Sequence, residues 1–169
     1  MIISILNCDK NYGIGRKNGL LFLLPKDMKF FRETTMNHVV CMGENTLLSF
    51  PGASPLKNRI NIVLSQDISH NYQGVVNVHS FDEFLKTIKE YEKNDTVFII
   101  GGASIYRQTL PYVDQVYLTK VNADGGAEVF FVNIDEEKDF SLIKESEPIM
   151  DGDIEIKFTI YQNNNKKEI

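Results

Sequence analysis

The chain has 169 residues, 43% of them hydrophobic and 24% charged, with a formal net charge of −5. This length allows one compact domain with a sizeable core, and the negative charge disfavours a general nucleic-acid or membrane-surface binder. An anionic substrate would need local positive groups. The apolar N-terminal run at residues 1–6 is too short to span a bilayer and has no basic lead, so we expect a cytoplasmic protein.

The first half of the chain alternates between strand-like and helix-like segments. Residues 1–8 are strand-like, and a turn-rich loop follows over residues 9–19. Proline is favoured at the first position of a helix, so Pro25 predicts a helix that ends near Thr35. Residues 38–42 form a strand-like run closed by Gly43, and helical turns are expected over residues 45–50.

The second half continues this alternation. Strands are predicted over residues 59–64 and 75–78, and Ser80 with Glu83 forms a capping box that opens a helix. Residues 96–100 are apolar on both alternating faces, as in a central parallel strand. A helix over residues 104–110 ends at Pro111. A further strand at 113–121 precedes an alternating, antiparallel-looking segment at 153–161.

Strands separated by helices predict the fold class: an α/β three-layer sandwich with a central, mostly parallel twisted sheet, one or more antiparallel C-terminal strands and about four flanking helices. Without repeats or a linker, we expect residues 1–162 to form a single domain and residues 163–169 to form a polar C-terminal tail, in which residues 163–167 should fray. In such folds, ligands bind at the carboxyl ends of the strands.

Asp27 lies in the first turn of the helix that begins at Pro25, where the helix dipole favours a carboxylate. Met28 and Phe31 share a face with it, so one side of the helix carries an acid beside apolar surface. On these residues alone, a solvated first-turn acid is the simpler interpretation.

Two strand-to-helix junctions are candidates for phosphate binding. Residues 99–104 contain a glycine pair before a helix start, and residues 42–46 place the Thr46 hydroxyl at a second start. Plain packing and a simple helix cap are the alternatives, since neither junction carries a full dinucleotide or Walker fingerprint. Arg59 suits a carboxylate ligand, although a solvated strand-end arginine is the commoner case.

The cysteines and histidines give no metal-binding or nucleophilic pattern. Cys8 and Cys41 lie in apolar, strand-like surroundings and are expected to be reduced core thiols. His38, His70 and His79 are scattered, and we interpret them as surface or strand-end residues. No metal site is predicted.

Taken together and in order, the motifs resemble the dihydrofolate reductase family. The matching residues keep the family's order and nearly its spacing over residues 1–120, whereas the C-terminal part fits less specifically. They are Gly13-Ile14-Gly15, Leu24 to Phe31, Thr34-Thr35, Met42-Gly43, Thr46, Ser49, Arg59, Asn61 to Ser65, Ile100-Gly101-Gly102, Ile105-Tyr106 and Tyr117-Leu118-Thr119.

The resemblance implies hydride transfer from C4 of NADPH to C6 of 7,8-dihydrofolate, with water-mediated protonation at N5. Dihydrofolate and antifolate-type inhibitors would be the ligands. Separately, we expect a monomer, because the sequence shows no exposed apolar stripe. The catalytic residues carried over are Asp27, Thr119 and Phe22. Asp27 would hydrogen-bond the pterin N3 and 2-amino group with support from Thr119, and burial should raise its pKa.

The resemblance also implies the binding residues. Backbone carbonyls of Ile5 and Ile100 would bind the pterin amino edge, and Arg59 the glutamate α-carboxylate. The substrate-binding set is Ile5, Asp27, Met28, Phe31, Phe50, Leu56, Arg59, Ile100 and Tyr106. The cofactor-binding set is Asn7, Ile14, Gly15, Gly43, Glu44, Asn45, Thr46, Leu64, Ser65, Gln66, Ile100, Gly101, Gly102, Ala103, Ser104 and Ile105. Residues 13–24 would form a lid.

Three residues depart from the family pattern. Phe22 stands where the pattern has tryptophan, which removes an indole N–H but keeps an apolar wall. Asn7 replaces a small residue beside the nicotinamide, and its side chain has no assigned role. Glu44 replaces arginine near the 2′-phosphate of NADPH, so we expect NADPH with weakened discrimination against NADH, the alternative cofactor.

Two alternative functions remain open from the sequence. One is a reductase of the same fold that acts on a ribosylaminopyrimidine in riboflavin synthesis, against which Asp27 and Arg59 argue. The other is a non-catalytic pterin- or nucleotide-binding protein, which is motivated by Phe22, Asn7 and Glu44.

Overall fold

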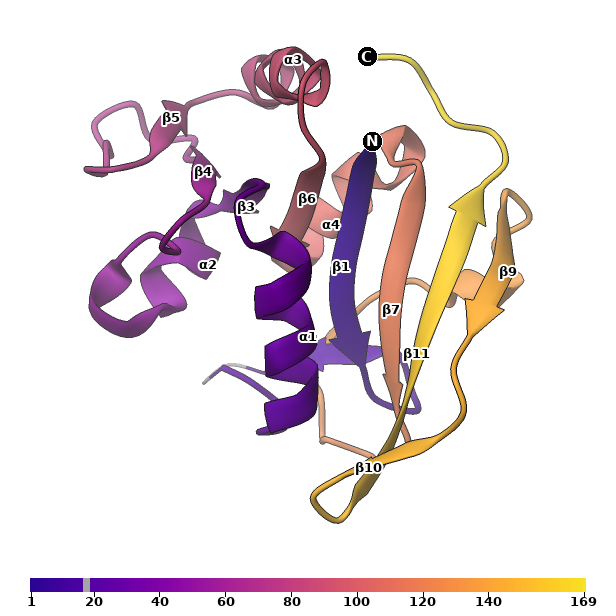
Figure 1. Ribbon diagram of the computed structural model, residues 1–169. Coiled ribbons are helices and arrows are strands. Elements are labelled where there is room, and N and C mark those ends of the chain that lie inside the picture. The colour runs from indigo at the N-terminus through magenta and orange to yellow at the C-terminus, as the bar shows by residue number, and fades with distance from the viewer. Residues whose placement is uncertain (17–18) are drawn as a thin grey trace.

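The structure is a computed structural model that describes residues 1–16 and 19–169. Its described residues form a nine-stranded sheet in the order β10-β11-β7-β1-β6-β3-β4-β5, with β9 paired to β11 (Figure 1). The strands are β1 (Ile2–Cys8), β3 (Val39–Gly43), β4 (Ile60–Leu64), β5 (Val76–Val78), β6 (Val97–Gly101), β7 (Gln115–Val121), β9 (Phe140–Glu145), β10 (Ile149–Asp151) and β11 (Ile154–Asn163).

The centre of this sheet is parallel. Strand β1 lies between β6 and β7 and runs parallel to both, and β3 runs parallel to β6 and β4. Because a parallel sheet is covered on both faces, its strands are mostly apolar. This explains why residues 96–100 carry apolar side chains in alternating positions on both faces, as the sequence predicted.

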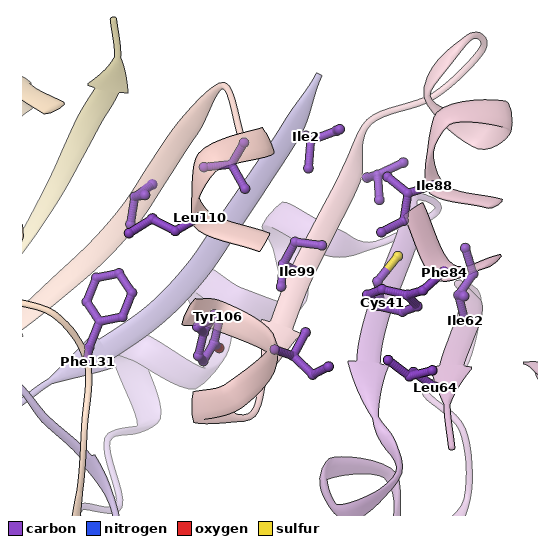
Figure 2. Close-up of a cluster of buried hydrophobic side chains, with 14 of the residues drawn as sticks. Ile2, Cys41, Ile62, Leu64, Phe84, Ile88, Ile99, Tyr106, Leu110 and Phe131 are labelled. Carbon is purple, nitrogen blue, oxygen red and sulfur yellow. The ribbon is translucent and has the colours of Figure 1, made fainter. Parts of the chain in front are cut away.

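In the described part of the chain, four α-helices cover the two faces: α1 (Pro25–Thr35), α2 (Glu44–Ser49), α3 (Phe81–Glu92) and α4 (Ala103–Thr109). Phe84 and Ile88 of α3 pack with Tyr106 of α4 against Cys41 and Ile99 of the sheet (Figure 2). On the other face, Phe30 of α1 and Leu47 of α2 pack against a separate cluster, whose sheet members are Ile3, Ile5, Val40, Met42, Val63 and Phe98. The three-layer α/β sandwich is confirmed.

The C-terminal strands are antiparallel, as predicted. Strand β11 pairs antiparallel with β7, β9 and β10. The expected fraying beyond residue 162 is wrong, because Asn163 is the last residue of β11 and donates from Nδ2 to the carbonyl of Val113 at 2.9 Å. Lys166 pairs with Asp114 at 3.0 Å, so interactions with the loop before β7 hold the tail in place.

The loop after β1 contains a short strand that the sequence did not predict. Strand β2 (Gly13–Gly15) pairs antiparallel with β8 (Val129–Phe130), and the Glu128 amide donates to the Gly15 carbonyl at 2.9 Å. The partner lies more than 100 residues away, so no local pattern reveals it. Residues 17 and 18 of the predicted lid lie outside the described residues.

None of the described helices is long and apolar enough to cross a membrane.

Candidate active site

The site forms where the first turn of α1 meets the carboxyl ends of β1 and β7. Asn7 and Thr119 are register partners on these two neighbouring strands. Thr119 Oγ1 donates to Asp27 Oδ1 at 2.7 Å, and Asn7 Nδ2 donates to Asp27 Oδ2 at 2.8 Å. Each carboxylate oxygen of Asp27 therefore has one protein donor.

The Asp27 carboxyl group is buried, with 9% of the residue exposed. Burial raises the pKa of Asp27, and the nearby Asp151 carboxylate acts in the same direction, whereas the hydrogen bonds from Thr119 and Asn7 lower it. The net effect is a raised pKa, as the sequence analysis expected. A ligand with N–H donors would stabilise the ionised form in this setting.

Asp151 fixes the start of helix α1. The N-cap position is Leu24, whose side chain has no acceptor, and Asp151 Oδ2 instead accepts from the amides of Lys26 at 3.0 Å and Asp27 at 3.1 Å. Lys26 Nζ also donates to the Met150 carbonyl at 2.6 Å. The antiparallel β10 strand thus sets the position of Asp27, a role that sequence reasoning missed because the two segments are more than 120 residues apart.

Tyr106 acts on the site through a backbone group. Its hydroxyl donates to the Ile5 carbonyl at 2.8 Å, and burial raises the pKa of Tyr106 well above its usual value. A carbonyl oxygen has two lone pairs, so Ile5 keeps one for a ligand. Ile100 is half-buried in the same apolar cluster as Ile5.

Apolar side chains line the α1 side of the site unevenly. Phe50, Leu56 and Phe30 pack with the cluster that contains Ile5, and the Phe30 ring lies 4.6 Å from that of Phe158. Phe31 is half-buried, whereas Met28 is 49% exposed. Phe30 therefore faces the sheet, whereas the side chain of Met28 points away from it.

Phe22, the third predicted catalytic residue, lies in a smaller cluster. It is half-buried and packs on the buried residues Leu24, Val121 and Ile156. Its ring approaches Gly125, where an added Cβ would lie 3.0 Å from Phe22 Cζ. The side chain therefore joins the segment before α1 to the loop after β7.

A cavity of about 480 Å³ opens at the other end of α1. Arg32, Lys57 and Arg59 contribute positive charge to its lining, which also includes Phe50 and Leu56. Arg59 is held by hydrogen bonds from Nη1 to Thr35 Oγ1 and from Nε to the Lys57 carbonyl, each 3.0 Å. Burial and the neighbouring Arg32 lower the pKa of Arg59. This region can accept an anionic group despite the negative net charge of the chain.

Helices α2 and α4 begin directly after the adjacent parallel strands β3 and β6. Their N-cap residues are Gly43 and Gly102, and within the described residues no side chain caps either start. The first-turn amides are therefore available to a phosphate. Gly101 has φ +128°, which favours glycine, and an added Cβ at Gly43 would make a close contact of 3.1 Å with the Ile105 side chain. This backbone cradle fits a dinucleotide diphosphate.

Glu44 has partners that the sequence did not reveal. Its Oε2 accepts from the Tyr72 hydroxyl at 2.5 Å and lies 2.7 Å from His70 Nδ1. The hydrogen bond from Tyr72 is the main cause that lowers the pKa of Glu44. His70 was interpreted as a surface residue; it is exposed, but it pairs with this carboxylate.

Comparisons with known proteins agree with this geometry. The family model for dihydrofolate reductase matches residues 1–165. The chain belongs to the dihydrofolate reductase family. The dihydrofolate reductase of Bacillus subtilis is 31% identical over 170 residues, covering 99% of this chain and 98% of the relative, and that of Staphylococcus haemolyticus is 33% identical over 85% and 84%.

A solved structure of the dihydrofolate reductase of Enterococcus faecalis, complexed with NADP(H) and RAB-propyl, superposes with a TM-score of 0.88. It is 26% identical in sequence, and the match covers 97% of this chain and 96% of that one. Family membership and fold therefore agree with the resemblance.

Most of the residues that the family resemblance selected lie at the carboxyl ends of the parallel strands or in the segments that follow them. Asn7 and Thr119 donate hydrogen bonds to Asp27, and Tyr106 donates to the carbonyl of Ile5. Thr46 lies over the Gly101–Gly102 pair. In the cofactor-binding set, Asn45, Gln66 and Ser104 are exposed. In the substrate-binding set, Met28 is exposed. The ligand roles of all of them remain predictions.

Proposed function

We propose that this chain reduces 7,8-dihydrofolate to 5,6,7,8-tetrahydrofolate with NADPH, and that Asp27 orients the pterin ring for that reaction. Family membership supports the reaction. The observation that carries the residue assignment is the buried Asp27 carboxylate, held by Thr119 and Asn7 at the strand ends. Both oxygens keep acceptor capacity, which matches the adjacent N3–H and 2-amino donors of a pterin.

The remaining substrate contacts follow from the position of Asp27. The carbonyls of Ile5 and Ile100 accept from the amino edge of the pterin, and Phe31, Phe50 and the other apolar residues enclose the ring system. At the far end of α1, Arg59 binds the α-carboxylate of the glutamate. The positive lining of the 480 Å³ cavity supports this assignment, because it supplies local charge in a chain of net charge −5.

NADPH supplies the hydride, from C4 of its nicotinamide to C6 of the pterin. The backbone cradle formed by Gly43, Gly101 and Gly102, with the Thr46 hydroxyl, would hold the diphosphate. Asn7 and Ile14 would flank the nicotinamide. The adenosine end would lie along Leu64 to Gln66, beside Glu44. The NADP(H) complex of the Enterococcus faecalis relative supports this cofactor.

Protonation at N5 does not come directly from Asp27, which binds the opposite edge of the pyrimidine ring. Asp27 instead polarises the pterin by accepting its N–H groups, and a water delivers the proton. Phe22, packed on Leu24 and Val121, supplies an apolar wall that limits solvent access. Burial of the site strengthens each electrostatic contact within it.

A substrate comparison tests the proposed function. The protein with NADPH is given either dihydrofolate or a ribosylaminopyrimidine, and oxidation of the nicotinamide is followed by absorbance. We expect turnover with dihydrofolate alone. Turnover with the pyrimidine alone would favour the riboflavin-type alternative, and binding of NADPH without turnover of either compound would favour the non-catalytic one.

We also propose that the protein acts as a cytoplasmic monomer whose ligands are dihydrofolate and antifolate-type inhibitors, without nucleic-acid or membrane partners. The negative net charge supports the last point. Light scattering after gel filtration tests the oligomeric state. A single species at the monomer mass of 19.3 kDa is expected, and a dimer mass at micromolar concentration would contradict it.

A further inference from the structure

Asn7 carries a side chain whose role the resemblance left unassigned. It lies near the end of β1, on the face that packs against α1, opposite Thr119 of β7 in the register. Its Nδ2 donates to Asp27 Oδ2 at 2.8 Å. The amide therefore contacts the residue that orients the substrate, and this contact is separate from any backbone contact with the nicotinamide.

The Asp27 carboxylate has more acceptor positions than the described protein groups fill. An ionised carboxylate offers about four acceptor positions, two on each oxygen. Within the described residues, its side chain accepts from Thr119 on Oδ1 and from Asn7 on Oδ2. One position remains on each oxygen. Two adjacent N–H donors on a flat ring edge would fill these two positions together.

We propose that Asn7 is a positioning residue for Asp27. With Thr119 it fixes the carboxylate plane, so that one free acceptor on each oxygen faces a ring edge with two adjacent N–H donors. A small apolar side chain at this position would leave Oδ2 without a protein donor, and the carboxylate could then rotate about its terminal torsion. This inference rests on the proposed function, because it assumes that the pterin edge binds at Asp27.

The same contact affects protonation. An N–H donor stabilises the charged form of its acceptor, so the Asn7 amide opposes the effect of burial on the pKa of Asp27. Within the described residues, Asp151 of β10 and Tyr106 of α4 are the other titratable groups that face Asp27. Asp151 also raises the pKa of Asp27. The Asp27 carboxylate helps to raise the pKa of Tyr106, which stays protonated and neutral. Removing the amide leaves both of these groups in place.

The experiment titrates the Asp27 carboxyl group by carbon NMR in the ligand-free protein, with the resonance assigned from Asp27→Asn. Asn7→Leu keeps a similar volume without the donor, and Asn7→Ala is a second variant in case leucine disturbs folding. Asn94→Ala, at an exposed position after α3, is the matched control. We expect the pKa of Asp27 to rise by about one pH unit in both Asn7 variants and to stay unchanged in the control.

Binding completes the test. We expect the Kd for dihydrofolate to rise about tenfold in both Asn7 variants, and the Kd for NADPH to change less than twofold. An unchanged Asp27 pKa with weaker NADPH binding would overturn the inference, because the side chain would then serve the cofactor. If the wild type binds dihydrofolate but does not reduce it, the proposed function is wrong. The titration of Asp27 in the Asn7 variants would still test whether Asn7 positions Asp27.

Discussion

At the scale of single residues, the burial of Asp27 links function to stability. Its raised pKa means that the folded protein holds this proton more tightly than the unfolded chain does. Below the unfolded-state pKa, Asp27 is protonated in both states and has no effect. The free energy of unfolding falls as the pH rises from the unfolded-state pKa through the raised folded-state pKa, because the unfolded chain releases this proton first.

Asp27→Asn should therefore gain stability relative to the wild type as the pH rises. Denaturant unfolding of both proteins at a series of pH values from acid to neutral measures this, since the other titrating groups cancel in the difference. As the pH rises above the ordinary Asp pKa, we expect the unfolding free energy of the variant to increase relative to that of the wild type. At higher pH, this difference should level off. A difference that does not change with pH would contradict the raised pKa.

We expect Glu44 to influence the choice between NADPH and NADH. Its carboxylate is held by Tyr72 and His70 beside the expected site of the adenosine ribose. In Glu44→Gln, loss of one negative charge should raise the ratio of kcat/KM for NADPH to that for NADH by about tenfold, and Glu44→Arg should raise it further. Glu90→Gln, on the exposed side of α3, serves as the control. An unchanged ratio in both Glu44 variants would show that this side chain does not face the 2′ position.

The sequence predicted the pairing of Asp27 with Thr119 only through the family resemblance, because the two residues are 92 positions apart. It left Asn7 without a role, since the hydrogen bond to Asp27 depends on the register of β1 and β7. The roles of Tyr72 and Asp151 were not predicted from the sequence for the same reason. Each has its functional contact with a distant segment, and nothing in the local pattern marks it.

At the scale of elements, local chemistry predicted the helices well. Pro25 and Thr35 bound α1 in the structure, and Ser80 accepts from the Glu83 amide at the start of α3 as the capping box requires. Strands β2 and β8 were not predicted, because each is two or three residues long and depends on the other for its hydrogen bonds. Short paired segments of this kind carry no periodic pattern.

Helix α1 depends on Asp151 for its N-terminal cap, which leads to a prediction at this scale. Asp151→Ala should lower the free energy of unfolding by about 1–3 kcal/mol, because two amides at the start of α1 lose their acceptor. It should also lower kcat/KM for dihydrofolate, because Asp27 lies in this first turn. Asp153→Ala, at an exposed position in the adjoining turn, is the matched control. Equal stability of the two variants in denaturant unfolding would contradict the capping role.

At the scale of the whole molecule, the parallel centre of the sheet brings the two helix starts and the Asp27 site to one edge. This arrangement follows from apolar strands and intervening helices, which is why the fold class was predictable from the sequence. The path of the C-terminal tail was not predictable from the sequence, because individual contacts with distant residues hold it in place. Lys166 pairs with Asp114, whose carboxylate also accepts from the Ile2 amide at 2.7 Å, and the Lys167 amide donates to the Pro111 carbonyl at 2.9 Å.

Removal of residues 164–169 should therefore destabilise the protein without changing its chemistry. The truncated chain loses the Lys166 ion pair, the Lys167 hydrogen bond and the packing of Ile169 on the core. We expect a lower Tm and an unchanged kcat, since none of these contacts lies at the strand ends that form the site. Thermal unfolding with steady-state kinetics measures both. An unchanged Tm would mean that the tail is frayed, as the sequence alone predicted.

The central claim is that this chain reduces dihydrofolate and that Asp27 orients the substrate. The most direct test mixes NADPH-loaded protein with dihydrofolate and follows the loss of reduced-nicotinamide absorbance in the wild type and in Asp27→Asn. We expect the wild type to oxidise one NADPH for each dihydrofolate. We expect Asp27→Asn to retain NADPH binding and to react at least about 100-fold more slowly. Full activity in Asp27→Asn, or no turnover by the wild type, would contradict the central claim.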